Sequence, residues 1–388
     1  ELGLFPWQGS RANNIVYPTP ETPPEHSSLH PWGIIKDDFE EDPARRYKMG
    51  YYQERQAAVP QAGKSASPEE RRRYFESVLE RHGMYSARSA DGIRWSLMSE
   101  EPVITDGAFD SQNLGFWDAM RGEYRVYHRD FRDGRDIKTC TSQDFVNWTE
   151  PEWVGYSPNR GGELYTNQVE PYYRAPHIFV GFPTRYFDRG WVEGMDALPQ
   201  AEHRRLRAES SPREGSAVTE GMFMSSRDAM TWNVWPEAFL RPGLRDRDGW
   251  FYGDNYQNWG IVETESAIQG AQRELSFYVT EAAHQPDTPK RLRRHSLRID
   301  GFVSVHAKLV GGEVLTKPMV YAGGELVLNV STSAAGSVRV ELQDEGGEPP
   351  PAAAAARRRR RDDSSSDDSE EEEEEENLAA AAAEALRQ

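Results

Sequence analysis

Ser89-Ala-Asp91-Gly-Ile-Arg-Trp95 recurs twice without gaps, as Ser142-Gln-Asp144-Phe-Val-Asn-Trp148 and as Ser226-Arg-Asp228-Ala-Met-Thr-Trp232. The copies share the pattern S-x-D-x-x-x-W, in which the Ser and Asp side chains can accept hydrogen bonds from nearby backbone amides and close a turn. The tryptophan can then fold back and pack beneath that turn. We interpret the repeat as an architectural β-turn between strands, and we expect its aspartates to be structural rather than catalytic.

Short runs rich in Tyr, Val, Ile, Phe and Trp surround this repeat and alternate with clusters of Gly, Pro, Asn and Asp. Such runs predict strands; examples are 123–128, 177–181, 275–280 and 325–330. Only residues 68–82 have helical periodicity, with Ser67 as the predicted N-cap and Gly83 at the end. The polar stretch 196–217 predicts a long surface loop. The sequence therefore predicts an all-β fold.

Composition excludes several classes of protein. The net charge of −18 over 388 residues argues against a nucleic-acid partner. No apolar stretch approaches the roughly 18 residues of a membrane-spanning helix. The single cysteine, Cys140, cannot form an internal disulfide or a Cys-based zinc site, and the nine histidines lack metal-binding spacing. We expect neither a metal nor a cofactor. No targeting signal can be read, and the oligomeric state stays open.

The repeated S-x-D-x-x-x-W hairpins on aromatic-rich strands resemble the five-bladed β-propellers of glycoside hydrolase families 32 and 43, particularly family 32 N-terminal domains. The resemblance implies a five-bladed propeller over residues 1–308, followed by partial β-sandwich strands over 309–348. Sialidases carry a related turn repeat, but theirs usually has Gly two residues after the Asp, where this chain has Ile93, Val146 and Met230.

Residues 349–388 are low in complexity, with three prolines, five consecutive arginines and seven consecutive glutamates. Blocks of like charge cannot bury enough apolar area to offset the entropy of ordering. We therefore expect a disordered tail after the sandwich segment.

Glycoside hydrolysis uses two carboxyl groups, one protonated as the acid and one ionised as the nucleophile or base. On a propeller these would lie where the innermost strands begin. Three stretches, 109–113, 165–177 and 250–265, combine Asp or Glu with amides and aromatic rings, the mixture that sugars prefer. They supply four candidate catalytic residues: Asp110, Glu170, Asp254 and Glu263.

The expected partner is a carbohydrate, whose hydroxyls and ring faces would be contacted by amide, guanidinium and indole side chains. The candidate substrate-binding residues are Asn13, Asn14, Asn113, Trp117, Asn167, Arg174 and Trp259.

The chain departs from the family 32 pattern at two motifs. Asn13-Asn14 is the nearest match to Asn-Asp-Pro-Asn, the motif of the nucleophile, but it supplies no carboxylate. Ala175 lies where the Asp of Arg-Asp-Pro would be. Two hypotheses follow: a glycoside hydrolase with a rearranged carboxylate pair, or a non-catalytic carbohydrate-binding propeller. A third alternative, a protein-interaction propeller of the WD type, is disfavoured because this chain lacks the Gly-His and Trp-Asp repeats of that class.

Overall fold

The computed structural model describes residues 2–6, 9–16, 29–53, 69, 83–244, 250–320 and 324–348. The chain divides into two units, Glu1–Leu297 and Arg298–Gln388. In the described residues all strands begin in the first unit, and its helices are few and short. The predicted all-β class is confirmed. The helix predicted over 68–82 and the tail over 349–388 lie outside the described residues, apart from Glu69.

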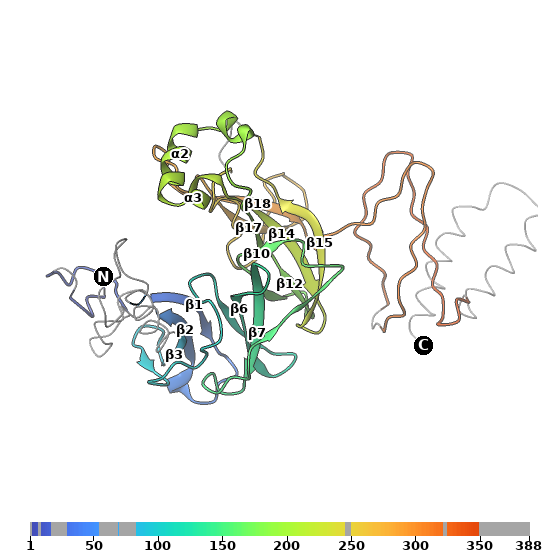
Figure 1. Cartoon of the computed structure of the whole chain (residues 1–388). Helices are drawn as coiled ribbons and strands as arrows, with labels where there is room; N and C mark the ends of the chain where they lie inside the picture. The colour runs from blue at the N-terminus through green and yellow to red at the C-terminus, as the bar shows by residue number, and fades with distance from the viewer. Residues whose placement is uncertain are drawn as a thin grey trace, which may run out of the picture. The chain divides into compact units, whose positions relative to one another are not determined.

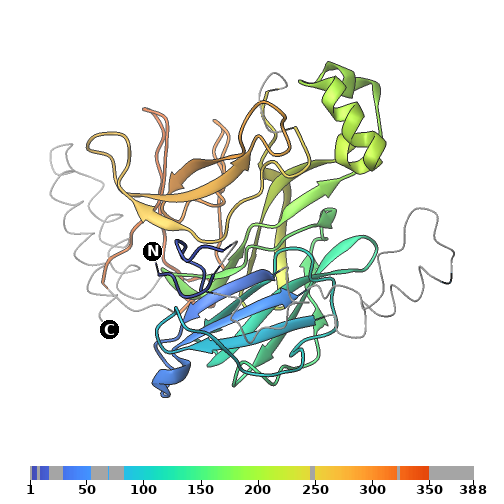
Figure 2. The same cartoon turned by 90° about the vertical axis from the view of Figure 1, so that its left-hand side faces the viewer.

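The first two sheets are four-stranded and antiparallel, and their strands follow one another in chain order (Figures 1 and 2). The first sheet contains β1 (Leu29–Lys36), β2 (Tyr47–Gln53), β3 (Gly83–Ser89) and β4 (Ser96–Leu97), with the short 3-10 helix η1 (Pro43–Arg45) before β2. The second contains β5 (Leu114–Asp118), β6 (Glu123–Phe131), β7 (Arg135–Ser142) and β8 (Glu152–Trp153).

The third sheet has seven strands and is organised around β14, which pairs with β12, β13 and β15. Its strands are β9 (Gly155–Ser157), β10 (Glu163–Leu164), β11 (Glu170–Tyr172), β12 (Ala175–Gly181), β13 (Thr184–Phe187), β14 (Val218–Ser226) and β15 (Thr231–Leu240). The fourth sheet has the order β16 (Val262–Thr264), β17 (Glu274–Glu281) and β18 (Arg291–Arg298). The described residues thus form four sheets, and the count of five blades stays a prediction.

Apolar side chains pack neighbouring sheets against each other in chain order. One buried cluster joins Tyr52 of β2 to Val126 of β6, and another joins Phe116 of β5 to Phe179 of β12. Leu240 of β15 packs with Phe277 and Val279 of β17, and so connects the third sheet to the fourth. Burial of large aromatic and aliphatic residues between sheets is the main stabilising contribution to such a fold.

Each copy of S-x-D-x-x-x-W forms the turn that the sequence predicts, before β4, after β7 and before β15. In the first copy, Ser89 Oγ lies 3.0 Å from Asp91 Oδ1, which accepts the backbone N–H groups two and three residues further on (2.9 and 2.8 Å). The same contacts recur at Asp144 and Asp228. Trp232 of the third copy is fully buried. The repeat is architectural, as expected.

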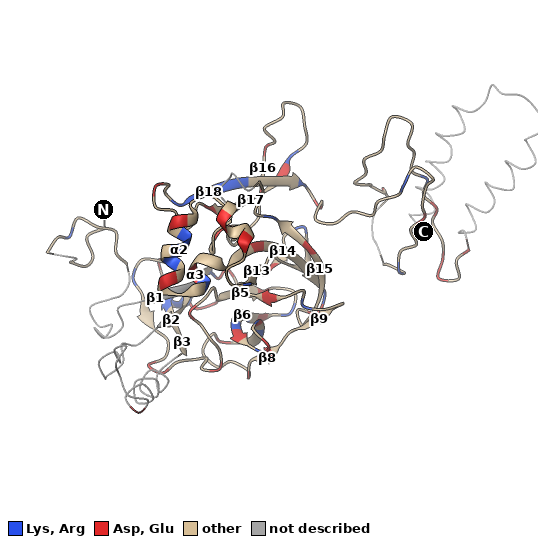
Figure 3. Cartoon of the chain, turned by 45° about the horizontal axis from the view of Figure 1, so that its top comes forward, with Lys and Arg blue, Asp and Glu red and all other residues tan. Residues whose placement is uncertain are grey.

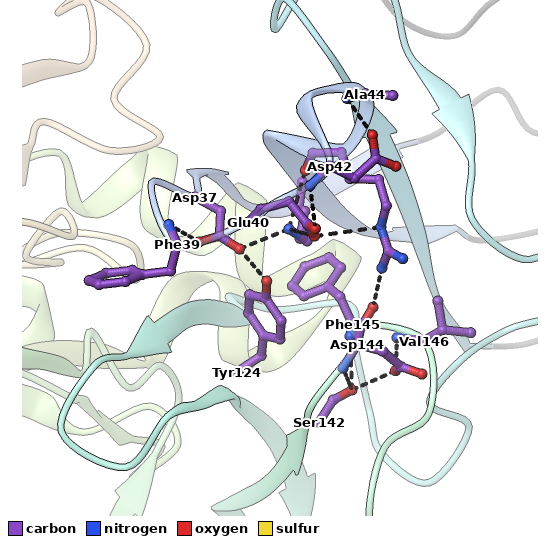
Figure 4. A network of polar contacts seen from close by, with 12 residues as sticks. Asp37, Phe39, Glu40, Asp42, Ala44, Tyr124, Ser142, Asp144, Phe145 and Val146 are labelled. Atoms are coloured by element: carbon purple, nitrogen blue, oxygen red, sulfur yellow. Dashed lines mark hydrogen bonds and ion pairs between the residues drawn. The ribbon is translucent and has the colours of Figure 1, made fainter.

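A polar network centred on Lys48 joins the first sheet to the second (Figure 4). The fully buried ammonium donates to Asp37 (2.8 Å), Glu40 (2.8 Å) and the backbone oxygen of Arg45 (3.2 Å). Tyr124 of β6 donates to the same Asp37 carboxylate. Burial alone would raise the pKa of Asp37, but the hydrogen bonds from Lys48 and Tyr124 lower it below its ordinary value.

The prediction of a loop over 196–217 is wrong, because this stretch forms η2 (Glu193–Ala197), α2 (Ala201–Ser210) and α3 (Pro212–Ser216). Charged residues of both signs alternate along α2 (Figure 3). Its one buried residue is Arg204, whose guanidinium lies 3.6 Å from the centre of the Phe251 ring. Since the inward position is occupied by Arg, no apolar periodicity indicated a helix.

The described residues of 309–348 contain no strand, and an isolated bridge pairs Lys308 with Gly311. Apolar side chains predicted to form sandwich strands are exposed, including Leu315, Val320 and Val327. Without a covered apolar face, these runs gain nothing from strand pairing. The prediction of a strand over 325–330 is therefore wrong, while the domain boundaries stay a prediction.

Candidate active site

Three segments that precede strands of different sheets lie side by side around residues 165–170. On one flank, Ser111 Oγ donates to the backbone oxygen of Tyr165 (2.9 Å). On the other flank, Gln168 Nε2 donates to the backbone oxygen of Gln257 (2.7 Å). The three stretches that the sequence analysis selected are therefore in contact, with residues 165–170 in the middle.

Glu170 begins β11, and its carboxyl group is buried beside the segment that leads into β16. Burial raises the pKa of Glu170 to about 7, and the hydrogen bond from the backbone N–H of Ile261 only partly opposes this rise. Its Oε1 atom is buried without a hydrogen-bond partner. Near neutral pH this carboxyl can therefore hold a proton and release it.

Two aromatic side chains remain accessible next to Glu170. Trp259 is 36% exposed, and its indole N–H donates to the backbone oxygen of Val169 (3.0 Å). Tyr173, at the turn between β11 and β12, is 49% exposed. Exposed rings that are fixed in place can stack on the C–H face of a sugar.

Glu263 of β16 lies in the same neighbourhood. Its carboxylate accepts the Tyr173 hydroxyl (2.5 Å) and pairs with Arg273 Nε (2.7 Å). Glu263 thus has a cation as a partner, whereas Glu170 has no cation among its recorded partners. Pairs of carboxyl groups with such different surroundings can divide the acid and base roles. We call Glu170, Tyr173, Trp259, Glu263 and Arg273 the Glu170 site.

Asp110 lies at the opposite end of the 165–170 segment. Its side chain is 65% exposed and pairs with Arg129, whose side chain is 4% exposed. The Arg129 guanidinium lies over the Tyr165 ring, 5.4 Å from its centre. The Arg135 guanidinium also lies over the Tyr165 ring, 5.0 Å from its centre, and pairs with Glu163 (2.8 Å). No contact recorded among the described residues joins Asp110 to the Glu170 site.

Asp254 is fully buried and holds backbone amides together. Its Oδ2 accepts the N–H of Phe251 (3.0 Å), and its Oδ1 accepts the N–H of Ala283 (2.7 Å). Oδ2 thus closes the turn of residues 251–254, and Oδ1 ties that turn to the segment that follows β17. This geometry gives Asp254 a structural task, and its catalytic role stays a prediction outside the Glu170 site.

The predicted asparagines bond mainly to backbone oxygens. Asn113 and Asn167 are buried and donate to Phe109 (2.9 Å) and Tyr127 (3.3 Å), while their own amide oxygens have no partner. Such groups can hold neighbouring strands, and their role in substrate binding stays a prediction.

Asn13 and Asn14 serve the N-terminal segment itself. Asn13 donates to the backbone oxygen of Phe5 (2.9 Å), and Asn14 accepts the N–H of Leu2 (2.9 Å). No contact recorded among the described residues connects either amide to Glu170.

Trp117 and Arg174 complete the predicted set. Trp117 packs edge-on against Tyr124, with ring centres 4.7 Å apart, and supports the apolar contact between the first two sheets. Arg174 is exposed beside Tyr173 in the turn between β11 and β12. Of the predicted residues, the structure brings together Glu170, Trp259 and Glu263, with Arg174 adjacent along the chain.

Sequence reasoning missed Tyr173 and Arg273 as partners of Glu263, and Tyr252 as a partner of Tyr165 (2.6 Å between hydroxyls). Tyr173 and Tyr252 stood within the selected stretches, so aromatic content was a usable signal for them. Arg273 follows a polar run with no pattern that could identify it. Within the described residues no group of His, Cys, Asp and Glu could hold a metal ion, and no helix is long and apolar enough to cross a membrane.

No protein-family model and no curated protein matches the chain. Solved structures with limited similarity include an N-acetylgalactosamine deacetylase from F. plautii in complex with blood group B trisaccharide, at 12% identity and TM-score 0.38, covering 69% of this chain and 66% of that one. A fructan 1-exohydrolase IIa from Cichorium intybus has 9% identity and TM-score 0.39, covering 72% and 44%. An endo-arabinase from Bacteroides thetaiotaomicron has 10% identity and TM-score 0.36, covering 72% and 76%. TM-scores this low assign neither a family nor a reaction.

Proposed function

We propose that the chain is a glycoside hydrolase of the propeller type that resembles families 32 and 43, with Glu170 as the general acid. The observation that carries the proposal is a buried carboxyl with a pKa of about 7 next to an exposed, fixed indole. A general acid works best when its pKa lies near the working pH. The protonated Glu170 would donate its proton to the glycosidic oxygen as the bond to the anomeric carbon breaks.

Glu263 is the second carboxyl in this proposal. It would either attack the anomeric carbon or remove a proton from the attacking water. Arg273 and Tyr173 hold its carboxylate in one orientation through contacts of 2.7 and 2.5 Å. Trp259 would stack on the sugar ring that lies between the two carboxyl groups.

The first experiment screens aryl glycosides and plant or algal oligosaccharides, with product anomers followed by NMR. On any substrate that the chain hydrolyses, Glu170→Gln should lower kcat by about 100-fold or more, because the amide cannot donate a proton to the leaving oxygen. Glu274→Gln is the matched control. Glu274 begins β17, which pairs with β16 of the Glu170 site, but its carboxylate pairs with Arg294. Near-normal turnover by Glu170→Gln would remove Glu170 from the mechanism.

Azide rescue assigns the role of Glu263. In a retaining reaction, azide replaces a missing carboxylate nucleophile and yields a glycosyl azide, so Glu263→Ala should regain turnover when azide is added. In an inverting reaction, azide would attack from the same face, so the anomer that the unmodified chain releases, followed by NMR, distinguishes the two reactions. Saccharide binding with no turnover of any substrate would instead indicate the non-catalytic carbohydrate-binding protein.

A further inference from the structure

A second set of polar and aromatic groups lies at the Tyr165 end of the 165–170 segment, away from Glu170. Asp110 presents an exposed carboxylate, and the guanidinium that fixes it is almost fully buried. The Arg129 Nε atom is buried there without a hydrogen-bond partner. An acceptor held rigidly at the surface loses little entropy when it binds a ligand.

Phenol groups supply donors beside this carboxylate. Tyr252 bonds to the hydroxyl of Tyr165 (2.6 Å) and also to that of Tyr256. Burial raises the pKa of Tyr252 and Tyr256 above the ordinary value, so both stay protonated. Tyr256 donates to Tyr252 and Tyr252 donates to Tyr165, so the Tyr165 hydroxyl, held in place by Tyr252, keeps a proton to donate to a ligand.

Charge at this end is close to balanced. Arg129 pairs with Asp110, and Arg135 pairs with Glu163. The exposed Arg213 lies 5.4 Å from the centre of the Tyr252 ring, and its nearest recorded carboxylate is 3.6 Å away. A neutral, hydroxyl-rich ligand fits this mixture of acceptor, donors and ring faces better than a polyanion does.

We propose that Asp110, Arg213 and Tyr252 form a distal subsite for a neutral sugar unit of the same chain that is cleaved at Glu170, which rests on the proposed function. Glu170 lies five positions after Tyr165, a distance of at most about 18 Å along a fully extended chain. Because the distal unit and the cleaved unit would bind at the two ends of this segment, the saccharide that reaches both contains more than one sugar unit. The subsite therefore predicts a substrate that is an oligosaccharide or polysaccharide rather than a short glycoside.

The test measures binding by calorimetry in the Glu170→Gln background, so that turnover does not interfere. The probes are the disaccharide and hexasaccharide of the xylo, manno, arabino and neoagaro series. Asp110→Asn and Tyr252→Phe should each weaken binding of a recognised hexasaccharide by about tenfold, because each removes one hydrogen bond that involves a fixed partner. Binding of the disaccharide should be unchanged.

Matched controls carry the same substitutions elsewhere. Asp106 is an exposed carboxylate paired with the buried Lys138, and Tyr278 is a partly exposed tyrosine of β17. Asp106→Asn and Tyr278→Phe should leave hexasaccharide affinity unchanged. Three results would overturn the subsite. They are an unchanged affinity of Asp110→Asn relative to the Glu170→Gln background, a loss of affinity in the controls as large as in the subsite variants, and no binding of any hexasaccharide. If no saccharide is hydrolysed, the unmodified chain is titrated with the same oligosaccharides. Hexasaccharide binding without hydrolysis would then contradict the proposed reaction but not the subsite.

Discussion

The first sheet and the junction of the third and fourth sheets both bury an ionisable side chain, but they treat it differently. Lys48 donates to two carboxylates and a backbone oxygen, and each of these contacts is 3.2 Å or shorter (Figure 4). Glu170 receives one backbone hydrogen bond, and its Oε1 atom has no partner. A buried charge costs little folding energy only when its polar atoms are paired.

The difference separates a structural group, Lys48, from the proposed general acid, Glu170. In the Lys48 network the pKa of Glu40 is lowered, because hydrogen bonds from Lys48 and the backbone outweigh the effect of burial. At Glu170 burial prevails, and the pKa rises to about 7. Natural folds rarely leave a buried carboxyl unsatisfied, and such strain concentrates where a reaction needs it. The predictions below test this contrast through stability and turnover.

The largest effect on stability is expected from Lys48→Met. The substitution leaves the buried carboxylate of Asp37 without its cation, while Glu40 keeps only Arg45 at 3.6 Å, and breaking a buried pair in this way typically costs about 3–5 kcal/mol. Urea denaturation at pH 7 should show this loss in the free energy of unfolding. Lys36→Met is the control, because Lys36 pairs with Asp38 at the surface, where an ion pair contributes about 1 kcal/mol or less. Similar losses of unfolding free energy in the two variants would show that the buried Lys48 network contributes no more than a surface ion pair.

Glu170→Gln should increase stability while it lowers turnover. Since the folded pKa lies above that of the unfolded chain, stability is full below about pH 4.5 and declines as the pH rises to about 7. The glutamine variant avoids this penalty, so it should gain about 3 kcal/mol at pH 8 and almost nothing at pH 4. Urea titrations at both pH values measure the difference.

Glu40→Gln serves as the control with the opposite sign. The pKa of Glu40 is lowered in the folded chain, so its stabilisation is present above about pH 4.5 and is lost as the pH falls further. The glutamine variant should therefore be less stable than the parent at pH 8. A gain of stability in both variants would show that loss of negative charge, and not the surroundings of each carboxyl, determines the result.

The sequence predicted the features that depend on local pattern. The S-x-D-x-x-x-W turns and the strands over 123–128, 177–181 and 275–280 are confirmed, because their side chains act within a few residues of each other. The helix α2 was missed, since Arg204 occupies its inward position.

At the site, the selected stretches supplied Glu170, Trp259 and Glu263, but nothing in the sequence pairs them. Tyr173 and Glu263 are 90 residues apart in the chain, and their contact exists only because the third and fourth sheets pack together. Local pattern also could not separate Asp254, whose two carboxylate oxygens both accept backbone amides, from Glu170, which accepts one and leaves Oε1 without a partner. Both follow polar, aromatic-rich stretches, and only burial and partners distinguish them.

The turn repeat adds surface carboxylates that accept several hydrogen bonds to the comparison of Lys48 with Glu170. Asp228 Oδ1 accepts two backbone N–H groups at 2.9 and 2.6 Å. Asp228→Ala should lower the free energy of unfolding by about 1–2 kcal/mol, because the donors lose a charged acceptor. The kcat of any hydrolysed substrate should not change. A loss of turnover beyond the fraction unfolded would give this turn aspartate a role in the reaction.

The smallest expected effect concerns the orientation of Glu263. Tyr173→Phe removes the hydroxyl that donates to its carboxylate, while Arg273 still holds it. We expect kcat to fall about three- to tenfold, which corresponds to about 1 kcal/mol, the usual contribution of one hydrogen bond. We expect kcat to decline above about pH 7, because Glu170 then loses its proton. Tyr173→Phe should leave this decline in place, because Tyr173 bonds to Glu263 and not to Glu170. A shift of that decline would mean that the two carboxyl groups titrate together, so that the proton could not be assigned to Glu170 alone. Tyr278→Phe, which removes a phenol hydroxyl from β17 outside the Glu170 site, should change neither kcat nor its pH dependence.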